Sequence, residues 1–532
     1  MDEFDFVVVG AGSSGGPIVD RLTAGGRYSV LLLEAGPDAS RRWLDIPLGF
    51  AKTFLDPAVN WKFVTEPEGQ LGGRRIYWPR GKVVGGSSAI NGMVYIRGLP
   101  SDYDAWRQMG NEGWSFDDCL PYFRRLEGHA DGGNESLGDS GPVKITQAEY
   151  RNELGETFLA ACAEIGLSEI ADFHGQPEGA SYYHATICDG RRVSTDQAYI
   201  RQARARPNCK LVTNALAERV VVEEGRATGI AYRVGGTART AKARREVILC
   251  AGTIGSPQLL QLSGLGPGAL LQDLGIPVVR DMPGVGENLQ DHYGVRSTYR
   301  TWWRLTVNDD INFLHRRLSA ALEYALLRTG PLTASPAFAG ALVRLMPQSQ
   351  EPDTQIHFFP WSTDRMDKGP HRFSGFSMLA NQSRPESRGH VRAVSPDPAA
   401  PPSIVANYLS TETDRQASIA AARFVRRLAR TTALGRLITE EILPGVEVWN
   451  DEDFLEYSRK EGQSAYHPVG TCRMGRDPGA VVDPQLKVHG VSGLRVVDAS
   501  IMPTLISTNT NAACMMIGEK AADMILSDAR AA

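Results

Sequence analysis

The apolar positions of the first 35 residues follow strand, helix and strand patterns in turn. Residues 4–9 (FDFVVV) form a short run rich in β-branched side chains, which the glycines of GAGSSGG end. The apolar positions from Pro17 to Leu22 have helical spacing, and YSVLLLEAG gives a second buried strand that ends at Glu34. Residues 4–35 therefore predict one βαβ unit of a nucleotide-binding fold.

Along the rest of the chain, the hydrophobic periodicity and the composition change from segment to segment. Residues 37–100 are rich in Gly, Pro and Trp and lack long periodic stretches, and a structureless region of this length is usually functional. The periodicity further along predicts helices at 103–127 and 153–166, a polar loop at 129–141, two or three strands within 210–234 and a buried strand at 245–252. Residues 295–455 differ from their flanks, and an apolar strand (LRVVDAS) and a helix follow them. We expect a nucleotide domain interrupted by a second domain.

Length and charge narrow the class of protein. The 532 residues are too many for one ordinary core, which favours two domains. The net charge of -4, without a sustained Lys/Arg stripe, gives no basic field of the kind that nucleic acid requires. We therefore expect a globular, enzyme-like protein without a nucleic-acid partner.

The cysteines and the hydropathy of the chain give expectations about disulfides, metal binding and cellular location. The seven cysteines are odd in number and form no C-x-x-C pair, so we expect neither a disulfide framework nor a bound metal. No stretch approaches the ~18 apolar residues of a spanning helix, and the N-terminus lacks the basic and apolar regions of a signal peptide. We expect a cytoplasmic protein without an integral membrane segment, and a peripheral position at the inner membrane stays open.

The first glycine-rich turn carries a dinucleotide fingerprint. Gly10-x-Gly12-x-x-Gly15 follows a strand and opens a helix. The first glycine permits the tight turn, the second lets a pyrophosphate approach the backbone, and the third allows close packing of helix on strand. Glu34 closes the second strand, where a carboxylate accepts hydrogen bonds from both ribose hydroxyls. The fingerprint alone does not choose between NAD and FAD.

Four motifs in order resemble the glucose-methanol-choline (GMC) oxidoreductase family. They are PRGKVVGGSSAINGMVYIRG at 79–98, GTIGSPQLLQLSGLG at 252–266, HPVGTCRMG at 467–475 and RVVDASIMPTLISTNTN at 495–511. The resemblance implies FAD and an α/β fold, in which a discontinuous Rossmann-type domain lies beside an α+β substrate domain with an antiparallel sheet and covering helices. We expect the FAD-binding domain at 1–150, 205–295 and 460–532, and the substrate-binding domain at 151–204 and 296–459.

The resemblance also implies the residues that hold FAD. Glycines near the flavin let backbone amides approach the ring and the pyrophosphate. The expected contacts are Gly10, Gly12, Ser13, Ser14, Gly15, Glu34 and Ala35 at the AMP half, Val220 at the adenine, Trp61 near the cofactor, Gly85, Gly86, Ser87, Asn91, Gly92, Met93 and Val94 at the pyrophosphate and flavin, and Asp498, Ala499, Thr510 and Asn511 beside the ribityl chain or flavin. Some members tether the flavin through a histidine, where this chain has Ile90. We therefore expect non-covalent FAD.

The same resemblance places His467 at the reacting atoms. An imidazole that titrates near neutrality suits removal of an alcohol proton while a hydride moves to flavin N5. The partner position matches Asn509 better than Asn511, and an asparagine amide donates to the alkoxide-like oxygen without competing as a base. The pattern thus predicts FAD-dependent oxidation of an alcohol to an aldehyde or ketone.

Substrate and electron acceptor are less defined. His357, Phe359 and Tyr466 are candidate pocket residues, although aromatic clusters more often serve as core. The acceptor is a quinone-like carrier or oxygen, with a lean toward a dehydrogenase. A hydroxynitrile-lyase-like protein that keeps FAD without net redox chemistry is the alternative, and a nucleotide-binding module without catalysis is a third interpretation.

Overall fold

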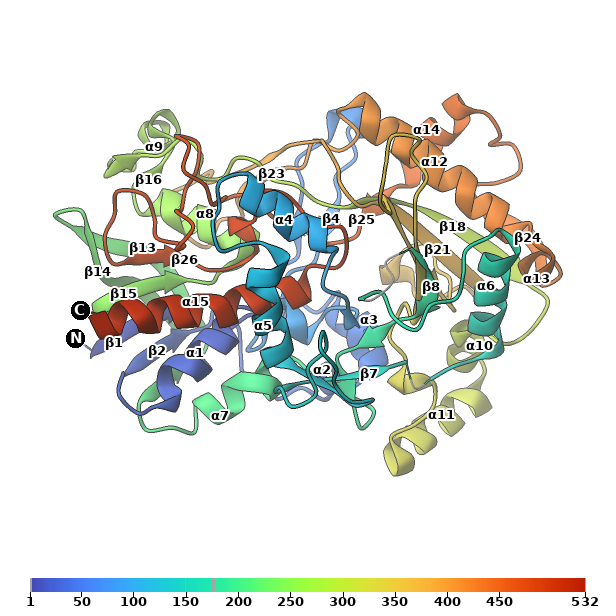
Figure 1. The fold of residues 1–532 in the computed structure, drawn as a ribbon, viewed down its shortest axis with the longest axis horizontal. Helices are drawn as coiled ribbons and strands as arrows, with labels where there is room; N and C mark the ends of the chain where they lie inside the picture. Colours follow the sequence, from blue (N-terminus) through green and yellow to red (C-terminus); the bar gives the residue numbers. More distant parts are fainter. Residues whose placement is uncertain (1, 149, 175–177, 532) are drawn as a thin grey trace.

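The computed structural model describes residues 2–148, 150–174 and 178–531. Two bodies lie side by side, each built on a seven-stranded sheet, and both chain ends lie in the same body (Figure 1). We call the body with the chain ends the nucleotide body and the other the substrate body. This arrangement confirms the fold class that the sequence predicts.

The nucleotide body contains the predicted βαβ unit at the centre of its sheet. The strand order is β12-β2-β1-β15-β14-β13, with β26 also paired to β15. The strands are β1 (Asp2–Val9), β2 (Val30–Leu33), β12 (Cys209–Val212), β13 (Ala215–Glu223), β14 (Arg226–Val234), β15 (Thr237–Leu249) and β26 (Leu494–Val496). Strands β12, β2, β1, the end of β15 and β26 are parallel, whereas β13, β14 and the start of β15 form an antiparallel meander.

Helices bury the apolar strands of this sheet. α1 (Gly15–Ala24) packs against α15 (Asn511–Ala531), which runs along the body toward the chain end (Figure 1). The other helices around it are α4 (Pro100–Gln108), α5 (Phe116–Leu126), α7 (Arg201–Ala203), α8 (Gly252–Leu262) and α9 (Gly268–Asp273). Phe6, Val7 and Val8 are fully buried in the resulting core, as expected for a parallel strand covered on both faces.

The substrate body has an antiparallel sheet of order β24-β18-β21-β20-β19-β8, with β25 paired to β18. The strands are β8 (Gly179–Tyr182), β18 (Tyr293–Thr301), β19 (Ala339–Val343), β20 (Thr354–Phe359), β21 (Gly375–Gln382), β24 (Ile438–Leu443) and β25 (Gln463–Ser464). The helices of this body are α6 (Glu153–Glu164), α10 (Val307–Asn312), α11 (Leu314–Leu327), α12 (Glu412–Ala429), α13 (Thr432–Gly435) and α14 (Asp451–Glu461). Phe158, Phe358 and Phe376 join the sheet to α12 and α6 in a second core.

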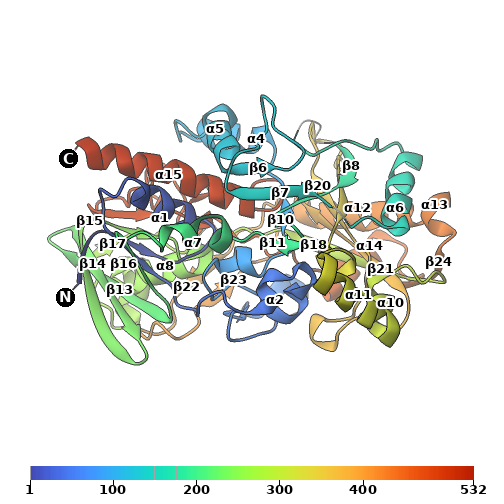
Figure 2. The same cartoon turned by 90° about the horizontal axis from the view of Figure 1, so that it is seen from below.

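Short elements, some of which, such as α2 and β23, lie between the two bodies, complete the fold (Figure 2). They are α2 (Arg42–Asp45), α3 (Phe50–Thr53), β3 (Phe63–Val64), β4 (Tyr77–Trp78), β5 (Val94–Tyr95), β6 (Glu127–His129), β7 (Val143–Gln147), β9 (His184–Ala185), β10 (Ile187–Cys188), β11 (Arg191–Arg192), β16 (Leu265–Gly266), β17 (Arg280–Asp281), β22 (His390–Arg392) and β23 (Ser403–Val405), with the short helices η1 (Pro47–Gly49), η2 (Gly69–Leu71), η3 (Gly86–Ala89), η4 (Asp196–Ile200), η5 (Pro331–Thr333), η6 (Met366–Lys368) and η7 (Ala499–Ile501). As predicted, 37–100 contains no long element.

Two expected boundaries differ from the structure. The helix predicted at 103–127 is two helices, α4 and α5, because Gly110 and Gly113 between them adopt positive φ angles of 92° and 83°. Residues 196–203, expected in the substrate domain, form η4 and α7 and pack on α1. Tyr199 is fully buried in the nucleotide core, so this segment sits with the nucleotide body.

None of the helices within the described residues is both long and apolar enough to cross a membrane.

Candidate active site

The carboxyl ends of five parallel strands meet at one edge of the nucleotide sheet. Val9, Leu33, Val212, Leu249 and Val496 lie in register there. A cavity of about 1300 Å³ begins at this edge and is lined by residues of both bodies. Ligands of parallel α/β sheets bind at this edge, so the cavity is the candidate site.

Two glycines hold the floor of the cavity so close that no side chain fits. Gly10 has a φ of 105°, and a Cβ there would lie 2.3 Å from the carbonyl oxygen of Cys250. Gly86 has a φ of 54°, and a Cβ there would lie 2.6 Å from the Cα of Gly12. The turn after β1 and the loop around η3 therefore meet backbone to backbone. Because these glycines have no side chains, a pyrophosphate can approach their backbone amides.

The N-terminus of α1 faces this floor. Ser14 is its N-cap residue, and its first turn has no acidic side chain. Ser13 donates its hydroxyl to Asn511 Oδ1 at 2.7 Å, which ties α1 to the start of α15. A helix N-terminus with unopposed amide dipoles binds phosphate groups.

Glu34 directly follows β2 beside the floor and is 6% exposed. Its Oε2 accepts from the amide of Ala11 at 3.0 Å and its Oε1 from the amide of Gly36 at 2.8 Å. Burial raises the pKa of this carboxyl to about 7, although both amide hydrogen bonds oppose the shift. Each oxygen keeps a second lone pair for a ribose hydroxyl.

Most of the residues expected at FAD line this one cavity. They are Gly10, Gly12, Ser13, Ser14, Glu34, Ala35, Trp61, Gly86, Ser87, Asn91, Gly92, Met93, Val94, Asp498, Ala499, Thr510 and Asn511. Gly15 and Gly85 lie just behind the lining. A Cβ on Gly15 would be 2.1 Å from the Gly10 carbonyl oxygen, and Gly85 donates its amide to the Ala11 carbonyl at 2.8 Å. They shape the floor and do not form the surface.

Val220 is the exception. It is 2% exposed in the nucleotide core, and its amide donates to Ser263 Oγ at 2.8 Å. The same strand reaches the cavity earlier, at Ala215, Leu216 and Ala217. The pairing of β13 with β14 shifts register after Ala217, and a bulge of this kind changes which face later residues occupy.

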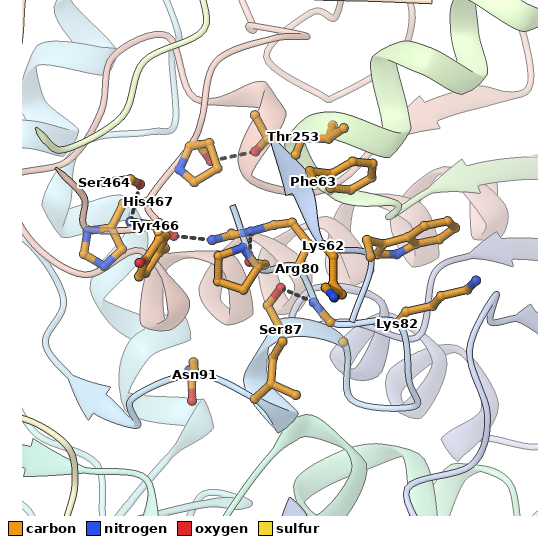
Figure 3. A pocket seen from close by; sticks show the side chains of 18 of the residues that line it. Lys62, Phe63, Arg80, Lys82, Ser87, Asn91, Thr253, Ser464, Tyr466 and His467 are labelled. Carbon is orange, nitrogen blue, oxygen red and sulfur yellow. Dashed lines mark hydrogen bonds between the residues drawn. The ribbon is translucent and has the colours of Figure 1, made fainter. Parts of the chain in front are cut away.

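His467 and Asn509 meet at the cavity surface. Asn509 Nδ2 lies 3.0 Å from His467 Nε2, and both residues line the cavity. Tyr466, with a φ of 66°, precedes the histidine, and its carbonyl accepts from Arg80 Nη2 at 2.6 Å (Figure 3). Burial lowers the pKa of His467 well below its ordinary value, and the nearby His292 and His357 add to this effect. His467 is therefore a neutral imidazole at pH 7.

The cavity surface beyond this pair belongs to β20. Gln355, His357 and Phe359 alternate along the strand and so point to one face of the sheet. Gln355 Nε2 donates to Asn509 Oδ1 at 3.1 Å, and His357 and Phe359 line the cavity. Burial lowers the pKa of His357 to about 3. The three expected pocket residues, Tyr466 included, thus share one cavity with the candidate base.

Sequence reasoning missed three residues that fix His467. Asp291 Oδ1 accepts from the His467 backbone amide at 2.7 Å, His292 Nδ1 lies 2.9 Å from His467 Nδ1, and Gln355 holds Asn509. Asp291 and His292 are consecutive in the run NLQDHYG. This adjacent Asp-His pair, directly before a buried strand, is the sequence feature that could have indicated two further site residues.

The cavity fits FAD on its own geometry. The glycine floor and the α1 N-terminus match a pyrophosphate, and Glu34 matches a ribose. The pair of His467 and Asn509 lines the same cavity next to β20 of the substrate body. Ile90, which stands where a covalent tether would attach, lines the cavity with a hydrocarbon side chain that has no nucleophilic atom. The site therefore suits FAD held without a covalent bond.

Comparison with known proteins decides the family. The N-terminal and C-terminal profiles of the GMC oxidoreductases match residues 4–294 and 385–518. The chain belongs to the GMC oxidoreductase family. It is 40% identical, over 99% of its length and 95% of the relative's, to a protein of Vibrio vulnificus (strain YJ016) named oxygen-dependent choline dehydrogenase.

Solved structures of GMC flavoenzymes show the same architecture. Pyridoxine 4-oxidase from Mesorbium loti superposes with a TM-score of 0.88 at 30% identity and covers 98% of both chains. A variant of formate oxidase from Aspergillus oryzae RIB40, studied for its FAD modification, superposes with a TM-score of 0.93 at 26% identity and covers 100% of this chain and 99% of its own. As a GMC protein the chain is an FAD-dependent oxidoreductase of alcohol CH-OH groups. Nothing in these comparisons supports the hydroxynitrile-lyase alternative.

Proposed function

We propose that His467 is the base and Asn509 its hydrogen-bonding partner in the oxidation of an uncharged alcohol with an aromatic or long apolar body. The observation that carries the proposal is the 3.0 Å contact between His467 Nε2 and Asn509 Nδ2 on the wall of the cavity. A hydroxyl that replaces this contact would meet a proton acceptor and a proton donor at once.

The protein's own groups prepare the alcohol for reaction. His467 Nε2 accepts the hydroxyl proton, and Asn509 Nδ2 donates to the oxygen as negative charge develops there. FAD, when bound, supplies the ring that accepts the hydride from the carbinol carbon. The glycine floor, the α1 N-terminus and Glu34 would hold its AMP half, and the residues around Asn91, Thr510 and Asn511 would hold the flavin. In this proposal the adenine meets Ala217 rather than Val220.

The lining points to an uncharged substrate. Phe359 and Trp361 lie 5.7 Å apart between ring centroids, and Phe50 lies 6.0 Å from Trp361, so an aromatic wall follows His357 along the cavity. Among the described lining residues seven are Lys or Arg and four are Asp or Glu, and Asp364, which lies beyond that wall, is exposed. An aromatic wall accepts a flat or apolar body, whereas the cationic balance disfavours a quaternary ammonium such as choline, the substrate in the curated relatives' names.

An exposed leucine stripe on α11 supports a location beside a membrane. Leu314, Leu318, Leu322 and Leu326 repeat every four residues and are 60–72% exposed, and α11 projects from the substrate body (Figure 1). Together with Leu327 they expose on the order of 500 Å² of apolar surface, which falls short of the roughly 800 Å² that each partner buries in a standard interface.

Basic side chains flank the stripe and favour an anionic lipid surface. Arg304, His315, Arg316, Arg317 and Arg328 lie on or next to α11. An amphipathic helix with a basic border lies in the interfacial plane of a bilayer.

The neighbouring α10 connects this surface to the cavity. Val307 donates its amide to the Pro360 carbonyl at 2.9 Å, and the loop after Pro360 contributes Thr363 to Met366 to the cavity lining. The seven described cysteines form no disulfide, as in reducing compartments. These features support the cytoplasmic face of the inner membrane as the location and a quinone-like carrier, rather than oxygen, as the acceptor.

Anaerobic reduction of the bound flavin tests the catalytic assignment. His467→Ala should retain FAD and its yellow colour but reduce it about 10²- to 10⁴-fold more slowly with alcohol. The exposed His315→Ala serves as the matched control and should reduce at the native rate. Near-native reduction by His467→Ala removes His467 from the mechanism.

A substrate panel tests the alcohol class. Benzyl alcohol and 1-octanol should bleach the flavin at lower concentration than choline, and a ubiquinone analogue should reoxidise it faster than air-saturated buffer. Preference for choline would overturn the uncharged class and leave alcohol oxidation in place. Faster reoxidation by oxygen would overturn the quinone-like acceptor.

A further inference from the structure

His292 is fully buried directly behind the candidate base, and its ring contacts His467 and the backbones of Ser383 and Ile506. Its Nε2 lies 2.9 Å from the carbonyl oxygen of Ser383, and its Nδ1 lies 2.9 Å from His467 Nδ1. The two imidazoles are perpendicular, with ring centroids 5.2 Å apart. No alcohol or cofactor reaches His292, which does not line the cavity.

The Ser383 carbonyl fixes the direction of every hydrogen bond that follows. A carbonyl oxygen only accepts, so His292 Nε2 carries a hydrogen and donates it. A neutral imidazole has one N-H, which leaves His292 Nδ1 as an acceptor. The hydrogen between the two rings therefore sits on His467 Nδ1, and His467 Nε2 is bare.

Both rings are neutral, as this reasoning requires. Burial lowers the pKa of His292 to about 4 and that of His467 well below its ordinary value. The positive charge of Arg80 also lowers the pKa of His467 and so opposes its protonation. The Asp291 carboxylate contacts the His467 backbone amide and the hydroxyls of Ser464 and Tyr408, not the ring.

The hydrogen bonds of Gln355 and Asn509, on the other side of His467, run in the same direction. Gln355 Nε2 donates to Asn509 Oδ1 at 3.1 Å, which turns Asn509 Nδ2 toward His467 Nε2 at 3.0 Å. A donor at this position needs the bare nitrogen that the Ser383 carbonyl imposes from the opposite end. The run from Gln355 through Asn509, His467 and His292 to Ser383 is therefore polarised in one direction.

We propose that His292 is a positioning residue that locks His467 in the Nδ1-H tautomer, with the accepting Nε2 directed at the substrate hydroxyl. The inference deepens the proposed function, since it rests on His467 as the base. With the other tautomer, Nε2 would present a hydrogen to the alcohol and accept nothing. In a serine protease triad, losing the group that sets the histidine tautomer slows turnover by about 10⁴-fold.

Two substitutions separate polarity from packing. His292→Gln can accept from His467 Nδ1 through Oε1 and donate to the Ser383 carbonyl through Nε2, so the limiting rate of anaerobic flavin reduction should stay within about tenfold of native. His292→Phe keeps a ring but offers no acceptor, and its rate should fall about 10²- to 10⁴-fold with FAD content retained. Equal losses in both variants would overturn the inference.

The tautomer itself can be observed without substrate. In protein labelled with ¹⁵N-histidine, the His467 signals, identified by their disappearance in His467→Gln, should report a protonated Nδ1 and a bare Nε2. His292→Phe should shift them toward the opposite tautomer or an average. A protonated His467 Nε2 in the native protein would overturn the inference, even if slow flavin reduction by His467→Ala supports His467 as the base. A native rate of flavin reduction by His467→Ala would instead overturn the proposed function, whatever tautomer is observed.

Discussion

At the scale of single residues, FAD binding would change the protonation state of Glu34. Glu34 already accepts two backbone amides, and burial still holds its pKa at about 7. Ribose hydroxyls would donate to its ionised form and lower that pKa. The protonation of one carboxyl is thus linked to cofactor binding.

FAD affinity should therefore depend on pH. Because binding favours the ionised carboxyl, the apparent Kd should weaken as the pH falls below about 7, by up to tenfold per pH unit, and level off above it. Titration of the apoprotein with FAD at pH 5.5 and pH 8 measures this effect. Glu34→Gln should bind more weakly and show a flat profile, and an equally steep profile in that variant would contradict the assignment.

The glycine floor gives a second prediction at this scale. Gly86→Ala should abolish FAD binding or lower the free energy of unfolding by several kcal/mol, since its Cβ would lie 2.6 Å from the Gly12 Cα in addition to the strain of a φ of 54°. Gly235→Ala has the same φ of 54° and open space around it, so it should cost only about 1 kcal/mol. Chemical denaturation and FAD content compare the two, and equal effects would show that strain alone matters.

The sequence predicted some of these residues and missed others for physical reasons. His467 and Asn509 stand in motifs, and the structure brings them together at 3.0 Å. His292 contacts His467 across 175 residues, and no local pattern reports such a pairing. Val220, which the family resemblance implied at the adenine, is buried in the nucleotide core, and a register shift in β13 separates it from Ala217 at the cavity.

At the scale of elements, periodicity was informative where one face is buried. The strands β1 and β2 and the helices α1, α6 and α15 lie where the sequence predicts them. The stretch 103–127 has a continuous helical pattern, yet two positive-φ glycines divide it into α4 and α5. α11 was not singled out, because its leucine periodicity is that of a core helix while the structure leaves the stripe exposed.

This stripe predicts binding to lipid. The native protein should sediment with vesicles that contain phosphatidylglycerol, and less with neutral vesicles or at high salt. The double variant Leu318→Asp and Leu322→Asp should lose this binding and keep its rate of flavin reduction. Val446→Asp, at a 78% exposed apolar residue outside α11, is the control and should still bind.

Two outcomes would contradict the lipid assignment. Native protein that stays in the supernatant with anionic vesicles would remove it. A dimer in solution that the double variant dissociates would assign the stripe to a second copy of the chain.

At the scale of the whole molecule, the cavity joins the two bodies. Its lining includes β1, β2, β20 and β21, which belong to both sheets. A ligand that binds only the folded state stabilises it by about 2.7 kcal/mol at 100 times its Kd. In the proposed placement, the AMP half would contact only the nucleotide body, whereas the flavin would reach His467 and β20.

The Tm of the apoprotein should accordingly rise with FAD concentration. FMN, which lacks the AMP half, should raise it far less at equal concentration, because Glu34 has no ribose to bind and the α1 N-terminus meets one phosphate instead of two. Differential scanning fluorimetry measures both titrations. Equal shifts with FMN and FAD would contradict the placement of the AMP half at Glu34.

The strand pairing of the nucleotide sheet has a consequence for synthesis. β1 pairs with β15, which completes its pairing only with β26, whose residues are 494–496. At about 5–20 residues per second a ribosome makes the intervening chain in roughly 25–100 s. During that interval the apolar β1 and β2 have no finished sheet to join, and contacts this distant in sequence fold slowly. We expect overproduced chain to need slow, cool expression or chaperones, because the cofactor edge is assembled last.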